Sequence, residues 1–476
     1  MSDISQESDK LTLCRSVDRW LLANPQLRSK PLALVLHTSC VNYSMECFQR
    51  FRRQRLPMIL PNNVAWELRL LQKSQHYGKR ARFLLECACE ASNWDLEQLY
   101  EHSNAPISPR QIFNGNLLFL FGDLNKQDEF LNHAADHPAC YIMVNPTWLH
   151  NSDELQVCPL GVMRKCAFRD PVPLTPSSAA PNITTLPQIR CTDASRASVS
   201  GADFRTTGQS GAYSCIYTHP AFPDQLLKIY RQSDQPGCRV QTGTYSQKLR
   251  YMQRYHQSVR LTNIAFPEHL LTNDRQQVLG YSMRHCHGVP LRQYIITGWK
   301  GKTEAEMGQI LQNLMLLLLE IHNRHMLAGD LSCNNILVDQ DNQVYLVDCD
   351  SFQFHQYPGG TATSMYKHPE VALEKVTYTL REPRHEYFAL AVLLFQCLMY
   401  DDPLPQQSAS MPSGWEHISF PLDIQGTHFP DVHPFIEEIW CNTDINIRRL
   451  FSDELHLRCD HSLGAWIRAL ELTDDI

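Results

Sequence analysis

The fold of the second half of this chain is decided by the stretch Ala328-Gly329-Asp330-Leu331-Ser332-Cys333-Asn334-Asn335-Ile336-Leu337-Val338, which is followed by Val344-Tyr345-Leu346-Val347-Asp348-Cys349-Asp350. Three polar side chains stand at fixed offsets in it: Asp330, Asn335 five residues later, and Asp348 thirteen residues after that. The apolar runs 336–338 and 344–347 predict two short strands. Asn335 therefore directly precedes one predicted strand, and Asp348 directly follows the other.

Residues of these types at this spacing suit phosphoryl transfer. A carboxylate near the attacking hydroxyl can position it in line with the γ-phosphate, while an amide oxygen and a second carboxylate can bind Mg²⁺. The alternative is a pair of turns with local hydrogen bonds, since single Asp and Asn residues are common turn formers. The combined spacing favours the phosphotransfer interpretation.

At these residues the sequence resembles the divergent bacterial protein kinase-like family, whose catalytic loop reads Gly-Asp-Leu and whose metal loop reads Asp-x-Asp-Ser. The resemblance covers about residues 200 to 460. It implies that Asp330 is the catalytic carboxylate and that Asn335 and Asp348 bind Mg²⁺. Asp350 is either a second metal ligand or the cap of the following turn.

An upstream segment, 208–217, resembles the glycine-rich loop of kinases, in which small residues let backbone N–H groups approach phosphate oxygens. Ser214 stands where the third glycine is expected. Lys228 follows inside the apolar stretch 226–230, where an ammonium costs free energy unless it meets an anion. We expect Lys228 to act in catalysis by binding the α- and β-phosphates; the alternative is a lysine that reaches solvent from a strand edge.

The strand lysine of an active kinase pairs with a glutamate on the next helix, and the matching position here is Gln247, which cannot form an ion pair. The run 278–283 is similar to the strand that enters the adenine hinge, with Met283 as gatekeeper and 284–288 as the connector. Apolar contacts are expected to hold the adenine. The expected ATP-binding residues are Gly208, Gly211, Ile216, Lys228 and Met283.

The length of 476 residues predicts two or three domains. A proline-rich stretch predicts a linker over 170–200, which separates a first domain, 1–169, from a second, 201–476. The second domain begins with a segment whose residues are typical of strands, and its sequence becomes typical of helices after Glu304. Together with the motifs, this predicts a two-lobed α+β protein kinase-like domain.

The first domain alternates strand-like runs at 32–36, 117–121 and 140–144 with helix-like text, which predicts an α/β domain with a parallel sheet. It resembles a PIN-type nuclease, a family that gathers carboxylates around a divalent metal. The residues that carry this resemblance are His37, Glu67, Asp123, Asp128 and Asn145, with His37 and Asn145 in place of two acids. The resemblance implies a PIN-like fold that binds a partner, and an ordinary α/β scaffold is the alternative.

Composition limits the partners and the compartment. The formal charge of −7 supplies no global basic field for nucleic acid or an anionic membrane. A local basic cluster faces either RNA or solvent: Arg50, Arg52, Arg53 and Arg55. No apolar run approaches the roughly 20 residues that span a bilayer, and the 17 cysteines form no CxxC pair. We therefore expect a cytoplasmic protein without a membrane partner.

The leading hypothesis is an ATP- and Mg²⁺-dependent serine/threonine protein kinase with a protein substrate or partner, whose PIN-like domain regulates it or binds that partner. One alternative is a nucleotide-binding pseudokinase adaptor, motivated by Gln247 and Ser214. The other is a metal-dependent RNase regulated by the kinase-like domain.

Overall fold

The chain forms two compact units in a computed structural model, residues 1–168, 302–326 and 382–476 in the first and 169–301 and 327–381 in the second. The structure describes residues 32–42, 52, 56–60, 63–92, 98, 116–121, 140–144, 156–159, 189–191, 198–210, 214–230, 243–259, 261–274, 276–354, 357–360, 362–373, 381–400, 422, 424, 434–458 and 461–472. Among these residues, no helix combines the length and apolarity needed to cross a membrane.

The first unit contains a five-stranded sheet in the order β2-β1-β3-β4-β5. Strands β2, β1, β3 and β4 run parallel to their neighbours, and β5 is antiparallel to β4. The strand bounds are β1 Leu32–Leu36, β2 Met58–Ile59, β3 Asn116–Phe121, β4 Cys140–Val144 and β5 Gln156–Pro159. Strands thus occupy the three runs where the sequence predicts them. The last four residues of β1 are buried, which explains why that run lacks polar alternation.

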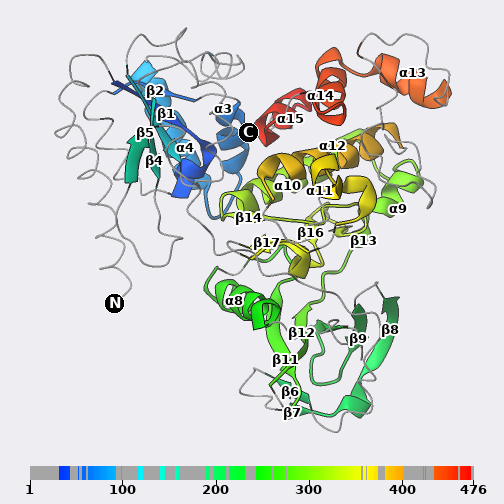
Figure 1. The fold of residues 1–476 in the computed structure, drawn as a ribbon. Helices are drawn as coiled ribbons and strands as arrows, with labels where there is room; N and C mark the ends of the chain where they lie inside the picture. The colour runs from blue at the N-terminus through cyan, green and yellow to red at the C-terminus, as the bar shows by residue number, and fades with distance from the viewer. Residues whose placement is uncertain are drawn as a thin grey trace. The chain divides into compact units, whose positions relative to one another are not determined.

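Helices complete the first unit (Figure 1). Their bounds are α3 Val64–Leu71, α4 Gly78–Ser92, α10 Glu304–His322, α12 Pro383–Met399, α13 Pro434–Asn442, α14 Ile445–Leu455 and α15 Leu463–Ala469. Helix α12 is buried along almost its whole length. Its Phe395 packs on Trp440 and Phe451, and Phe451 packs on Trp466. This aromatic cluster joins the C-terminal helices.

Helix α3 packs against α10 and α15, which is why the N-terminal segment and the later helices form one unit. The backbone N–H of Gly464 donates to Glu67 Oε1 at 2.9 Å, and Lys73 donates to Gln312 at 2.9 Å. A Cβ at Gly464 would lie only 2.4 Å from the carbonyl oxygen of Asn63. The sequence predicts separate domains of 1–169 and 201–476. The packing of α3 against α10 and α15 is not visible from the sequence, because the contacting residues lie far apart along the chain.

The second unit is built on a seven-stranded antiparallel sheet in the order β7-β6-β11-β12-β10-β9-β8. The bounds are β6 Ile189–Cys191, β7 Ser198–Val199, β8 Arg205–Ser210, β9 Ser214–Thr218, β10 Gln225–Tyr230, β11 Pro267–Thr272 and β12 Val278–Arg284. Strands β6 and β7 lie within 170–200, the segment that the sequence predicts to be a linker. Strand β6 pairs with β11 and so extends the sheet.

Helix α8, Gly243–Val259, lies against β11 (Figure 1). A smaller sheet in the order β13-β15-β16 carries the loops of the motif region. The remaining elements of the described residues are η2 Thr38–Asn42, η6 Gly201–Asp203, β13 Val289–Pro290, α9 Leu291–Ile296, β14 Met326–Leu327, β15 Ile336–Val338, β16 Val344–Leu346, η7 Cys349–Ser351, β17 Gln353–Phe354, η8 Ser364–Tyr366 and α11 Pro369–Leu373. Two of these strands are those predicted at 336–338 and 344–347, and β16 ends one residue early.

The contact between α15 and α3 is open to a direct test with Gly464→Ala. The new methyl group would collide with the backbone of Asn63, so we expect a loss of about 1–3 kcal/mol of unfolding free energy. Gly308→Ala, in helix α10, is the matched control, because nothing lies within 4 Å of a Cβ there. Thermal unfolding should show a lower midpoint for the first variant only, and equal midpoints would contradict the packing.

Candidate functional site

Strand β10 places Lys228 in the interior of the antiparallel sheet, opposite Tyr281 of β12. The Lys228 side chain is only 6% exposed. Its Nζ donates to Asp350 Oδ1 at 2.6 Å and lies 3.2 Å from Asp348 Oδ1. A buried ammonium costs free energy unless an anion compensates it, so these carboxylates are what allows a lysine here.

The two carboxylates also set the charge of Lys228. Burial by itself lowers the pKa of a lysine, but Asp350 and then Asp348 outweigh that effect and hold the pKa of Lys228 above its ordinary value. Lys228 is thus a buried cation and does not extend to solvent from a strand edge.

Asp350 is the centre of a buried hydrogen-bond network. Besides Lys228, the hydroxyl of Tyr230 donates to its Oδ2 at 2.9 Å, and the hydroxyl of Tyr281 donates to its Oδ1 at 3.1 Å. Lys228 and Tyr230 share a face of β10 because they are two residues apart, and Tyr281 is the cross-strand neighbour of Lys228. Neither role predicted for Asp350 describes this contact, since its side chain pairs with Lys228.

Helix α8 supplies a lysine where the sequence pointed to a glutamine. Gln247 is exposed, and the buried residue beside it is Lys248. Lys248 Nζ donates to the backbone oxygens of Asp350 at 2.8 Å and Pro358 at 3.1 Å. The assignment of Gln247 as the residue that faces Lys228 is therefore wrong, because adjacent residues on a helix point about 100° apart.

Lys248 is a weak base in this position. Burial lowers its pKa to about 7; Arg381 and Lys228 add to the lowering, while Asp350 and Cys349 oppose it. A neutral amine still has two N–H donors, which match the two carbonyl oxygens that Lys248 contacts.

Gly329 explains the Gly-Asp-Leu form of the catalytic loop. Its backbone has φ 72°, in the left-handed region, and a Cβ there would lie 2.3 Å from the carbonyl oxygen of Ser351. Arg381 donates to the carbonyl oxygen of Gly329 and, at 2.6 Å, to that of Gly360. The loop before Asp330 is thereby held tightly against the loop after Asp350.

Asp330 and Asn335, which the sequence places five residues apart, are in direct contact. The Asn335 amide nitrogen donates to the Asp330 backbone oxygen at 2.9 Å and to its Oδ2 at 3.0 Å. Asp330 Oδ1 accepts the backbone N–H of Thr363 at 2.7 Å. These bonds fix the orientation of the Asp330 carboxylate.

The side-chain oxygens of Asn335 and Asp348, at one end of the β15–β16 hairpin, suit Mg²⁺. The N–H of Val347 donates to the carbonyl oxygen of Asn335 at 3.0 Å, so the hairpin brings Asp348 and Asn335 to one end. The amide nitrogen of Asn335 is committed to Asp330, which leaves its amide oxygen for a cation. Asp348 is 46% exposed and has a left-handed backbone with φ 58°, an uncommon conformation that recurs at functional sites. Carboxylate and amide oxygens are ligands that Mg²⁺ accepts.

An apolar surface lies on the same face of the sheet as Lys228. Met283 and Cys286 belong to a buried cluster, against which partly buried side chains pack: Ile216, Leu226, Leu337, Tyr345 and Val347. Such a surface suits a flat, weakly polar ring. Gly208 has φ +81°, and nothing lies within 4 Å of the position of a Cβ there, which suits a loop whose backbone approaches a phosphate. Gly211 lies outside the described residues.

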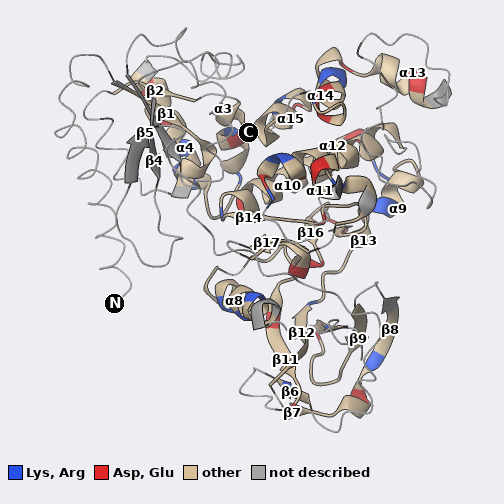
Figure 2. Cartoon of the chain, viewed as in Figure 1, with Lys and Arg blue, Asp and Glu red and all other residues tan. Residues whose placement is uncertain are grey.

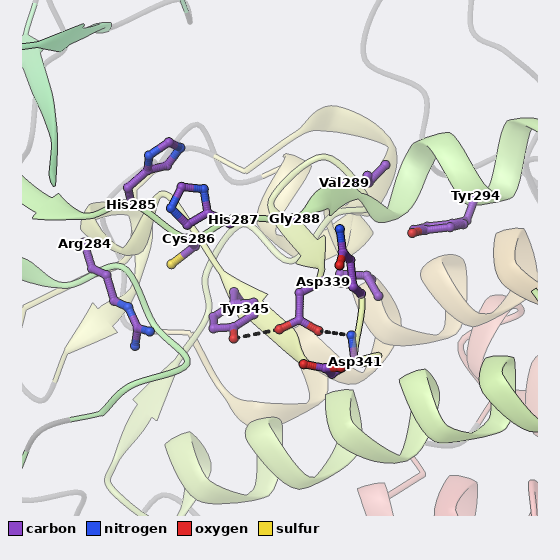
Figure 3. A pocket seen from close by; sticks show the side chains of 12 residues that line it. Arg284, His285, Cys286, His287, Gly288, Val289, Tyr294, Asp339, Asp341 and Tyr345 are labelled. Carbon is purple, nitrogen blue, oxygen red and sulfur yellow. Dashed lines mark hydrogen bonds between the residues drawn. The ribbon is translucent and has the colours of Figure 1, made fainter. Parts of the chain in front are cut away.

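A pocket of about 570 Å³ opens beside the connector that follows β12 (Figure 3). The rings of His285 and His287 lie 4.1 Å apart there, and Tyr345 donates to Asp339 at 2.9 Å. Burial, and then His287, lower the pKa of His285. The pocket shares Cys286 and Tyr345 with the apolar cluster, so it adjoins the surface expected to receive adenine.

The N-terminal candidates are only partly described. Glu67 is buried, and both its oxygens are used inside the unit: Thr38 donates to Oε2 and Gly464 to Oε1. His37 is buried with Ser39, 2.9 Å from Nδ1 to Oγ. Outside the described residues lie Asp123, Asp128, Asn145, Arg50, Arg53 and Arg55.

Arg52 is the described member of the predicted basic cluster. It is exposed and pairs with Glu90 of α4. Part of its charge is therefore compensated within the chain.

Sequence reasoning missed Lys248, Tyr230, Tyr281 and Arg381. The sequence does contain one indication that the partner of Lys228 lies elsewhere: α8 has no Asp or Glu. Figure 2 shows basic residues along this helix. The partner of Lys228 therefore had to come from another element.

No protein-family model matches the chain. The chain is similar to the protein described as protein kinase YegI in Escherichia coli strain K12 and in Escherichia coli O157:H7, with 24% identity over 202 residues in each case. The match covers 40% of this chain and spans 30% of the length of those relatives. This similarity supports a distant kinase-like relationship.

The lowered pKa of Lys248 predicts a pH effect on stability. Between pH 7 and about 10 the unfolded chain binds this proton and the folded chain does not, so the wild type should gain stability over Lys248→Met as pH rises, by up to roughly 1.4 kcal/mol per pH unit. Thermal unfolding at pH 7 and pH 9 measures this difference. Lys300→Met, at an exposed position, is the control. Parallel pH profiles for wild type and Lys248→Met would contradict the prediction.

Proposed function

We propose that the chain is an ATP- and Mg²⁺-dependent serine/threonine protein kinase, with an N-terminal PIN-like region that regulates it or binds a partner. The observation that carries the proposal is the buried cation Lys228, held by two carboxylates on the same sheet face as an apolar surface. A buried charge of this kind costs free energy, and such perturbed charged groups cluster at functional sites.

The residues of the chain divide the work as follows. Lys228 and the loop around Gly208 bind the phosphates, and Ile216 and Met283 hold the adenine by apolar contact. Asn335 and Asp348 would hold Mg²⁺, which neutralises phosphate charge when bound. Asp330, fixed by Asn335 and Thr363, accepts a hydrogen bond from the substrate hydroxyl and aims it at the γ-phosphorus.

One of the two observations that support the adaptor alternative no longer does so. The alternative rested on Gln247, which left Lys228 without an ionic partner, and on Ser214. Asp350 supplies that partner from another element, so the absence of a helix carboxylate does not argue against catalysis. Ser214 is the motive that remains.

The RNase alternative requires Glu67 as a metal ligand. Both oxygens of Glu67 accept hydrogen bonds within the first unit, which favours a role in packing.

Transfer of labelled γ-phosphate to the protein itself or to a generic substrate tests the proposal. We expect Asp330→Ala to lower transfer at least about 100-fold, because it removes the group that orients the nucleophile. Asp203→Ala, at an exposed carboxylate of η6, is the control and should transfer like wild type. The labelled amino acid should be serine or threonine.

Two outcomes would refute this proposal. Equal labelling of wild type and Asp330→Ala would exclude catalysis by Asp330. No labelling with either, combined with a thermal shift on adding ATP and Mg²⁺, would favour the adaptor.

A further inference from the structure

Lys228 has two acidic neighbours with different exposure. The Asp350 side chain is 10% exposed and lies 2.6 Å from Nζ, whereas the Asp348 side chain is 46% exposed and lies at 3.2 Å. Only Asp348 is open enough to reach a metal ion and a nucleotide. The two carboxylates are therefore suited to different tasks.

Asp350 is fixed independently of any ligand. The hydroxyls of Tyr230 and Tyr281 donate to its carboxylate, and Lys248 holds its backbone oxygen. With Lys228, four side chains from β10, β12 and α8 determine where this carboxylate lies. A carboxylate held this way keeps the ammonium of Lys228 in one position.

Helix α8 offers no substitute. It contains no acidic residue, Gln247 is exposed, and its inward residue is Lys248. A second amine on this helix beside Lys228 cannot supply a counter-charge. The acid that pairs with Lys228 comes from the metal loop.

Resting on the proposed function, we infer that Asp350 is the positioning residue of the phosphate-binding lysine, in the place of a helix carboxylate, and that Asp348 is only its temporary partner. On nucleotide binding, Lys228 exchanges Asp348 for phosphate oxygens and keeps Asp350. Asp348 is thereby released for the metal ion.

This division of roles gives opposite expectations for two similar substitutions when magnesium is absent. Asp348→Asn removes a carboxylate that competes with phosphate for Lys228, so affinity should stay equal or rise. Asp350→Asn removes the charge that positions Lys228, so affinity should fall about tenfold, the scale of one charge-assisted hydrogen bond. Because Asp350 is buried and Asp348 is 46% exposed, thermal unfolding of each variant is needed to separate a change in affinity from a loss of the fold.

The experiment is a titration of the full chain with fluorescent N-methylanthraniloyl-ATP in EDTA and then in Mg²⁺, with thermal unfolding of each variant alongside. In EDTA we expect weak binding by Asp350→Asn, wild-type binding by Asp348→Asn, and intermediate binding by Asp350→Glu, which keeps the charge. With Mg²⁺, Asp348→Asn should lose the gain that the metal gives wild type.

Matched controls address the helix and the fold. Gln247→Glu adds a carboxylate to the exposed face of α8, and it should neither change wild-type binding nor restore Asp350→Asn. If Asp350→Asn does not fold, Tyr281→Phe removes one hydroxyl donor and keeps the ring, and should weaken binding roughly threefold.

Several results would overturn the inference: wild-type affinity in Asp350→Asn or, where that variant does not fold, in Tyr281→Phe; equal losses in Asp348→Asn and Asp350→Asn in EDTA; or restoration by Gln247→Glu. A wild type that binds no nucleotide under either condition would overturn the proposed function itself, and this inference with it.

Discussion

The buried ion pair between Lys228 and Asp350 is the interaction on which the rest of the site depends. An ammonium inside an antiparallel sheet would be strongly unfavourable by itself, and a carboxylate with two tyrosine donors compensates it. Because Asp350 lies two residues after Asp348, the pair also ties the metal loop to the sheet. The position of Asp348, and with it the candidate metal site, follows from that connection.

A second constraint is the close packing of loops around Gly329. Only a residue without a Cβ permits the approach of Ser351, and Arg381 joins the carbonyl oxygens on both sides. The glycine of the Gly-Asp-Leu motif thus has a steric cause. The orientation of Asp330, held by Asn335 and Thr363, is built on this packed base.

In the first unit, an acid that the sequence offers as a metal ligand takes part in packing. Glu67 at the start of a helix resembles a metal ligand, yet its carboxylate bonds Thr38 and the backbone of Gly464. The contact joins helix α3 to helix α15, so the acid contributes to packing between segments far apart in sequence. A PIN-like fold for this region remains a prediction.

The sequence by itself determined the features that depend on local spacing. The hairpin strands and the place of Lys228 in an apolar strand both follow from residues close together along the chain. The sequence could not decide whether Gln247 or Lys248 points inward from α8, because that depends on the rotation of the helix about its axis. Nor could it place Asp350, 122 residues from Lys228 along the chain, opposite that lysine. Only the tertiary structure decided these contacts, since burial and the counter-charge of an ion pair depend on which elements pack together.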